Sequence, residues 1–473
     1  MIEASSFQCL LVNFSSIFTE PTFRNFMALC CSWLICSGRR TVSRVIQAAG
    51  ANGEGPRHHS IFYRFFSRAV WDPDKLGAVT LRLVLELLPE DAPIILTVDD
   101  TLCRRSGAHI WGGGMHHDAL LSNYGRGKSL VKVFSFGHNW VIVCACVQTP
   151  WNRNRFMAVP VAFRLYRSKK HCPKDRYRKR TELAREIVTS LDALIPKDRR
   201  ILLLGDTEYA CREVVRGLPE RIVFVGPMSM DAALYAPPPP KQKGRGRPRV
   251  KGRRLMSPKQ LIATDNIPWE SQEMLLYGKT VTVLVKTQTC LWYTVAGAKR
   301  VRMLVTRDPN GRLDDRAYFS TDEEMTVKKI AQSFSLRWTQ EEMHRNVKQH
   351  LGLQDPQNGW WRRPKGQRRD KRIPGPQPHK ERGEKAVTRT VPFLLTTYAM
   401  VVLWYFSNGR AQDDVERARK RAPWYRKKTE PSFGDMLAAI RRRLWAERNF
   451  SEPAPEQGAE KLSPTLLEWL CAA

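Results

Sequence analysis

The sequence lacks a regular cysteine framework. Its 11 cysteines are an odd number, no two of them form a C-x2-C pair, and Cys144 and Cys146 are separated by a single residue. These spacings argue against a zinc finger and against a disulfide scaffold. We therefore expect reduced thiols, as in a cytoplasmic protein.

Long uninterrupted apolar runs are also missing. The two most apolar stretches, residues 26–36 and 391–406, are shorter than the roughly 20 residues that a membrane-spanning helix needs. No charged segment precedes an apolar run near the start, where the first basic residue is Arg24, so we expect no signal peptide. A membrane is therefore not an expected partner, and both stretches are predicted to be buried helices.

Acidic side chains are few relative to basic ones. Against 78 Lys and Arg there are 46 Asp and Glu, which gives a formal net charge of +32. Such an excess repels itself unless a polyanion binds, so nucleic acid is the first expected partner. With 473 residues, 42% of them hydrophobic, the chain is long enough for two or three domains with a large core.

Two apolar runs that end in carboxylates predict buried strands. Residues 93–101 carry Asp99 and Asp100, and residues 199–206 end at Asp206. The neighbouring segments give an order of three strands, helix, strand, helix, strand: residues 129–147, 156–166, 181–195, 209–218 and 221–225. This order resembles the α/β ribonuclease-H-like fold, a mixed five-stranded sheet flanked by helices. The resemblance implies that the first and fourth strands are neighbours, with Asp100 beside Asp206.

Residues 326–351 contain neither Pro nor Gly, and Gly352 follows, so we predict one long helix that ends there. Phe334, Glu341 and Lys348 are seven residues apart, and Arg337 lies one turn before Glu341, which puts all four on one stripe. Taken alone, the stripe is typical of a surface helix with ion pairs. Together with Asp100 and Asp206, however, Glu341 completes a set of three carboxylates that suits two hard divalent cations.

These residues also carry a family resemblance. The spacing Phe334-x2-Arg337-x3-Glu341-x6-Lys348 resembles the Tyr-x2-Arg-x3-Glu-x6-Lys signature of DDE transposases encoded by bacterial insertion sequences. Asp100 followed by Thr resembles the first acidic motif of that family, and Asp206 resembles the second. The sequence departs from the signature at Phe334, where Tyr is usual, so a hydrogen bond from this ring is not carried over.

The resemblance implies that Asp100, Asp206 and Glu341 bind two Mg²⁺ or Mn²⁺ ions, and that Arg337 and Lys348 contact DNA phosphates. Asp99 competes with Asp100, which is preferred because Thr101 follows it. Glu342 competes with Glu341, which the spacing favours.

The reaction that the resemblance implies is metal-dependent cleavage at the ends of an insertion sequence, followed by strand transfer. The second strand would be cut through a hairpin or by another route. The implied partners are double-stranded DNA, as terminal inverted repeats and target, and a second copy of the chain in a synaptic complex. The implied location is the nucleoid in the bacterial cytoplasm. A catalytically inactive DNA-binding descendant and a structure-selective nuclease are the alternatives.

Five regions are expected along the chain: residues 1–90, 91–228, 229–322, 323–410 and 411–473. The first is helical, the second and fourth form the catalytic core, the third holds a basic linker and a β-rich insertion, and the fifth is basic and helical. The first region is compatible with a DNA-binding helix-turn-helix, and equally with an ordinary helical subdomain that buries Phe62, Phe65 and Phe66.

Two further DNA contacts are conceivable in the third region. Arg245 and Arg247 belong to an RGRPR segment that resembles the core of an AT-hook, which lies in a narrow minor groove. A solvated basic linker is the commoner reading of such a segment. Trp292 could stack on an unpaired base, although a Trp in an alternating strand is usually part of a core.

Overall fold

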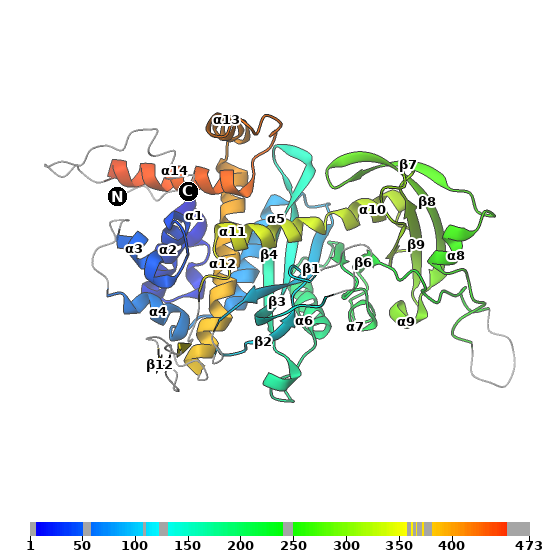
Figure 1. Ribbon diagram of the computed structural model, residues 1–473, viewed down its shortest axis with the longest axis horizontal. Coiled ribbons are helices and arrows are strands. Elements are labelled where there is room, and N and C mark those ends of the chain that lie inside the picture. Colours follow the sequence, from blue (N-terminus) through cyan, green and yellow to red (C-terminus); the bar gives the residue numbers. More distant parts are fainter. Residues whose placement is uncertain are drawn as a thin grey trace.

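The computed structural model describes residues 6–50, 58–106, 110–122, 131–239, 249–356, 361–362, 366, 371–372 and 381–451. All structural statements below concern these residues. Strands form the centre of the molecule, and helices cover both faces of the sheet and gather at one end (Figure 1).

Six strands make up the first part of the sheet: β1 (Ile94–Arg104), β2 (Gly114–His117), β3 (Phe134–Thr149), β4 (Asn152–Tyr166), β5 (Ile201–Gly205) and β6 (Ile222–Pro227). Strand β3 is antiparallel to β1 and β4, whereas β1, β5 and β6 run parallel to one another. Apart from the short β2, the spatial order is β4-β3-β1-β5-β6. This order confirms the predicted ribonuclease-H-like arrangement.

The predicted β-rich insertion continues this same sheet. Its strands are β7 (Glu270–Leu276), β8 (Lys279–Leu291), β9 (Arg300–Arg307) and β10 (Arg316–Ser320). Strand β10 pairs antiparallel with β6, with Phe319 opposite Gly226, so one sheet of ten strands runs from the core into the insertion. The short helices α8 (Pro258–Ala263) and α9 (Tyr293–Ala296) flank these strands.

Helices α6 (Arg180–Leu194) and α7 (Arg212–Val215) lie between the core strands in the sequence, where helices are expected. The prediction of one helix over residues 326–351 is wrong at one point. The segment forms α10 (Val327–Ser335) and α11 (Trp338–His350), which follow one another nearly in line (Figure 1). At the junction the N–H groups of Leu336 and Arg337 bond to carbonyls only three residues back, which is the tighter 3₁₀ pattern.

The first and last parts of the chain build one helical layer. It contains α1 (Ser6–Val12), α2 (Glu20–Ile35), α3 (Val42–Gly50), α4 (Ser60–Ser67), α5 (Pro73–Leu87), α12 (Glu381–Asn408), α13 (Ala411–Arg421) and α14 (Phe433–Ser451). The rings of Phe26 and Phe65 both pack against Phe393 of α12, with centroids about 6 Å apart. Phe62, Phe65 and Phe66 are all buried in this core.

Helix α12 is long and apolar enough to cross a membrane by length and composition alone, but 94% of its apolar window is buried inside the protein. It packs against α4, α5 and β4. It is therefore the central helix of the core, as predicted for residues 391–406.

Candidate active site

Strand β1 presents alternate side chains to opposite faces of the sheet. Ile95 packs with Leu204 of β5 in the apolar cluster that includes α10, whereas Leu96 belongs to the main core. Odd-numbered residues of β1 therefore face α10 and α11, and even-numbered residues face away from them. Asp99 lies on the first of these faces and Asp100 on the second.

Asp99 is joined to Glu341 through one arginine. Nη1 of Arg337 lies 3.3 Å from Oδ2 of Asp99, and Nη2 of the same guanidinium lies 2.5 Å from Oε1 of Glu341. Arg337 occupies the junction between α10 and α11, and Glu341 lies in the first turn of α11. The tight turn between the two helices thus holds a cation between two carboxylates that are 242 positions apart in the chain.

Asp206 directly follows β5 on the same face as Asp99. The parallel register pairs Val98 with Gly205, so the next residues along the two strands are Asp99 and Asp206. Oδ1 of Asp206 accepts the backbone N–H groups of Glu208 (2.9 Å) and Tyr209 (3.2 Å), which fixes its direction at the start of the following turn.

Asp100 belongs to a different polar network. Its Oδ2 accepts hydrogen bonds from Asn139 (2.6 Å) and from Nη1 of Arg180 (3.4 Å), and its Oδ1 accepts one from the hydroxyl of Tyr209 (3.4 Å). Nε of Arg180 also donates to Glu208 at 2.6 Å. Arg180 therefore connects β1 to the turn that holds Asp206, from the face opposite to Arg337.

This geometry bears on the sequence-based choice between the two aspartates. The sequence favours Asp100, but its side chain points away from Arg337, and Asp99 is the aspartate of β1 that contacts Arg337. The charge of Asp100 still acts on Asp206. Alternation along β1 showed that only one of the two could face the glutamate. Which face α11 covers depends on the packing of α10, and no local signal in β1 reports it.

Burial dominates the electrostatics of the two aspartates on this face. It raises the pKa of Asp99 to about 8, with Asp100 and Asp206 adding to the rise and Arg337 opposing it. Burial also raises the pKa of Asp206, against the hydrogen bonds from Tyr209 and Glu208. The ionised forms of both carboxyl groups are therefore costly here unless a nearby cation compensates them.

The other two residues of the predicted stripe differ in their surroundings. Lys348 is half-buried, and this burial lowers its pKa; its charge interacts with Asp99 and Asp118. Glu342 points away from Arg337: one of its carboxylate oxygens lies 3.9 Å from Arg155 of β4 and the other 3.9 Å from Arg345. Glu341, which the spacing favoured, is the glutamate beside Arg337.

Four of the residues predicted to contact DNA lie in different surroundings. Phe334 packs against the ring of Tyr318, with centroids 4.7 Å apart, and Arg337 lies over its face. Trp292 is only 7% exposed and packs edge-to-face on Phe319 at 5.0 Å, so the suggestion that it stacks on a base is corrected: it is part of the core. Arg245 and Arg247 lie outside the described residues.

The donor set suits a hard divalent cation. Asp99, Asp206 and Glu341 offer carboxylate oxygens on one face, and burial together with the neighbouring aspartates raises the pKa of Asp99. Within the described parts of the chain, no three His, Cys, Asp or Glu side chains are gathered as a metal cluster, and Arg337 lies between two of the carboxylates. Arg337 bonds one oxygen of Asp99 and one of Glu341, so a metal ion at this face would compete with its guanidinium for these carboxylates.

Comparisons with known proteins returned the following similarities. A cryo-EM structure of a piggyBac transposase synaptic complex with hairpin DNA aligns with 94% of this chain and 78% of its own, at 8% identity and a TM-score of 0.37. A search of curated proteins found no match.

A family model described as DDE superfamily endonuclease matches residues 13–294. The match covers more than half of the chain. It includes Asp99, Asp100 and Asp206 and ends before Arg337 and Glu341. The chain belongs to the DDE superfamily endonuclease family.

Proposed function

We propose that this protein is a transposase that cuts and joins DNA at the ends of an insertion sequence, with Asp99, Asp206 and Glu341 as its catalytic carboxylates. The observation that carries the proposal is the position of Arg337, which links Asp99 to Glu341 on the face where β5 delivers Asp206. Family membership and the net charge of +32 support a nucleic-acid substrate.

The three carboxylates would hold two Mg²⁺ or Mn²⁺ ions, which, when bound, activate the attacking oxygen and stabilise the leaving oxygen of a phosphodiester. Arg337 contacts two of the carboxylates, and the charge of Lys348 interacts with that of Asp99. Once Arg337 releases Asp99 or Glu341, its guanidinium is free to pair with a phosphate, for which its planar fork is well suited. Lys348 supplies a second positive charge on the same helix.

The proposed chemistry has two stages. A water oxygen attacks the phosphorus at the end of the element, the bond to the 3′ oxygen breaks, and a 3′-hydroxyl and a 5′-phosphate are left. That 3′-hydroxyl then attacks a phosphorus of another strand and displaces its 3′ oxygen, either across the duplex to form a hairpin or in the target. A pair of such chains would hold the two DNA ends together in the nucleoid.

The test is an assay of cleavage and strand joining on DNA that carries the terminal repeats, with Mg²⁺ or Mn²⁺. Glu341→Gln is expected to lose about 10³-fold in cleavage rate while it still binds DNA. Glu342→Gln is the matched control, one residue away on the same helix, and should retain activity. Cutting without joining would favour a structure-selective nuclease, and DNA binding without cutting would favour an inactive descendant.

A further inference from the structure

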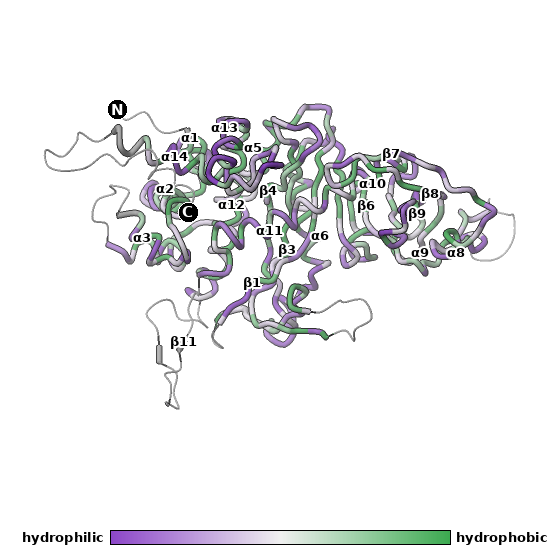
Figure 2. Tube along the Cα trace, turned by 45° about the horizontal axis from the view of Figure 1, so that its top comes forward, coloured by the Kyte–Doolittle hydropathy of each residue, from purple (hydrophilic) through white to green (hydrophobic). Residues whose placement is uncertain are grey.

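A basic pocket of about 940 Å³ lies away from the carboxylates, where the end of α11 meets the α2–α3 connection and the segment between α13 and α14. Six basic residues and one acidic residue line it. Helix α13, which borders the pocket, is strongly hydrophilic along its length (Figure 2). The pocket therefore offers a concentrated positive charge with little acidic compensation.

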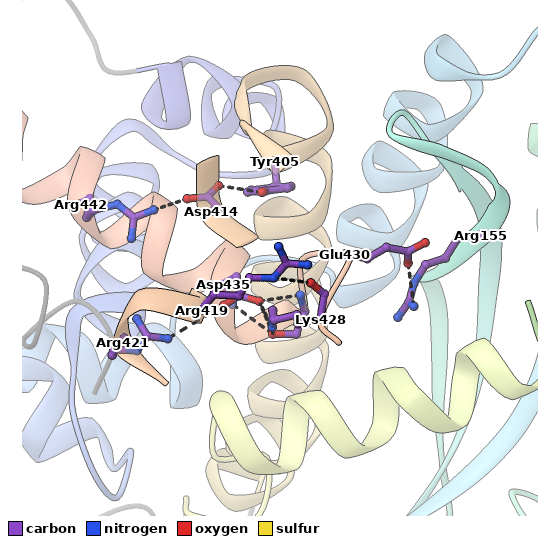
Figure 3. Close-up of polar contacts among 10 residues, drawn as sticks. Arg155, Tyr405, Asp414, Arg419, Arg421, Lys428, Glu430, Asp435 and Arg442 are labelled. Atoms are coloured by element: carbon purple, nitrogen blue, oxygen red, sulfur yellow. Dashed lines mark hydrogen bonds and ion pairs between the residues drawn. The ribbon is translucent and has the colours of Figure 1, made fainter. Parts of the chain in front are cut away.

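The acidic residue of the pocket, Asp435, is already engaged within the protein. Its carboxylate accepts hydrogen bonds from the N–H and the hydroxyl of Ser432 (2.7 and 2.6 Å), and it lies 2.5 Å from Nζ of Lys428 and 4.0 Å from Arg421 (Figure 3). Among the described residues, no ion pair involves Arg426 or Lys427. These two exposed cations of the lining are left for an external anion.

Arg40 adds a buried group that lacks an acceptor. Its residue is only 5% exposed and lines the pocket. Nη1 donates to the carbonyl of Gly38 at 3.3 Å, but Nε has no hydrogen-bond partner in the part of the chain that the structure describes. A buried N–H without an acceptor is costly, so an anion that enters the pocket would satisfy a group that the protein itself leaves unsatisfied.

Two aromatic rings stand at the rim of the pocket. Trp424 and Tyr425 are 74% and 58% exposed, and their ring centroids are 6.1 Å apart. Large aromatic side chains are rarely left in water without a partner, and beside cations they form the usual platform for an unpaired base. The pocket thus combines sites for a phosphate and for a base.

We propose that this pocket binds single-stranded DNA, with phosphates on Arg40, Arg426 and Lys427 and a base stacked on Trp424. The proposal rests on the proposed action of the protein on DNA and extends it to a second contact. His350 of the pocket and Glu341 of the candidate active site lie nine residues apart on α11, about 13 Å along the helix axis and on opposite sides of the helix. A DNA strand that contacts both places would therefore have to pass around the end of α11.

The experiment measures fluorescence anisotropy of a fluorescein-labelled oligothymidylate of about ten nucleotides. The full chain with Glu341→Gln is used, with EDTA and without divalent metal. Replacing both Arg426 and Lys427 by Ala should lower the salt slope of log K by about 1.4, for two lost phosphate contacts. Trp424→Ala should weaken binding about 10-fold, and Trp424→Phe should restore most of it because a ring remains.

The matched control replaces Arg410 and Lys420 by Ala. Both residues are exposed, both lie on or next to α13, and neither lines the pocket. Equal losses in the pocket and control variants, or no binding by the parent chain, would overturn the proposal. Binding of poly-glutamate that depends on the same residues, without DNA binding, would instead assign the pocket to an acidic protein.

Because this assay contains no divalent metal, it is independent of catalysis. A protein that cuts DNA but whose pocket variants bind normally would refute the pocket alone. A protein that never cuts DNA but loses binding in the pocket variants would refute the proposed catalysis alone. The altered side chains are exposed, so equal melting temperatures of the variants serve as the check on folding.

Discussion

The guanidinium of Arg337 lies 3.3 Å from the carboxylate of Asp99, which is 238 residues away in the chain. Its second Nη donates to Glu341, so one cation neutralises two carboxylates on the inner face of the sheet. Burial and the neighbouring aspartates raise the pKa of Asp99, and Arg337 is the group that opposes this rise. Arg337 thereby neutralises part of the negative charge of these carboxylates. During the proposed reaction, divalent cations would take over this role.

The first prediction separates the adjacent aspartates of β1. Asp99→Asn is expected to reduce the single-turnover cleavage rate about 10³-fold, because Asp99 faces Arg337 and Glu341. Asp100→Asn should cost far less, because its side chain faces Arg180 and Asn139 on the other side. If Asp100→Asn lowered the cleavage rate more than Asp99→Asn, Asp100 would be the catalytic aspartate, as the sequence favours.

The second prediction concerns Arg337 itself. Arg337→Ala leaves Asp99 and Glu341 without their shared cation, and removing one partner of a buried pair costs about 3 kcal/mol of unfolding free energy. Added Mn²⁺ should raise the melting temperature of this variant more than that of the parent. The control is Arg345→Ala on the same helix, where the side chain is exposed. If both variants melt alike and neither responds to Mn²⁺, Arg337 does not have this role.

The third prediction tests a close approach between α5 and β4. A Cβ on Gly77 would lie 2.1 Å from the carbonyl oxygen of Val161, and this oxygen belongs to a strand that cannot easily shift. Gly77→Ala should therefore destabilise the protein by about 2 kcal/mol, although Ala normally stabilises a helix interior. Gly434→Ala in α14, where the nearest atom is 3.4 Å away, is the control. Thermal melting of the two variants measures the difference.

The fourth prediction is a loss of stability in acid. Burial lowers the pKa of both His138 and His344 to about 3, and nearby cations add to the effect. The unfolded chain binds a proton on each near pH 6.5, so stability should fall as the pH drops from 6.5 toward 3. The slope is about 1.4 kcal/mol per pH unit for each histidine in that window.

His138→Gln is expected to make this pH dependence shallower in urea unfolding measured between pH 7 and pH 4. His58→Gln, at an exposed position, is the control for replacing an imidazole without disturbing the core. An unchanged slope in His138→Gln would mean that His138 takes up its proton in the folded protein.

Much of the fold follows from local patterns in the sequence. The apolar runs that end at Asp100 and Asp206 predicted β1 and β5, and the order of elements predicted that they are neighbours. The helix junction at Leu336 was not predictable, because nothing in its composition opposes a continuous helix. The insertion was recognised as strands, but its junction with β6 depends on pairing over about 90 residues, which alternation alone does not encode.

The candidate site was predictable in its residue types and less so in its geometry. Spacing favours Glu341 over Glu342, and in the structure Arg337 contacts Glu341 whereas Arg155 lies near Glu342. Spacing does not distinguish Asp99 from Asp100, because the two are adjacent in one strand. They differ only in the face of the sheet to which their side chains point. Asn139 and Arg180, the hydrogen-bond partners of Asp100, belong to no recognisable sequence motif. Only the tertiary structure shows that they contact it.

The hydrogen-bonded ladder between β10 and β6 has a mechanical consequence. A paired sheet resists local bending, so a force on the outer edge near β7 is transmitted through β8, β9 and β10 to β6 and then to β5, which Asp206 directly follows. The insertion is therefore a rigid arm anchored next to the second carboxylate. A force on the far end of the insertion would therefore change the distances between the acidic side chains.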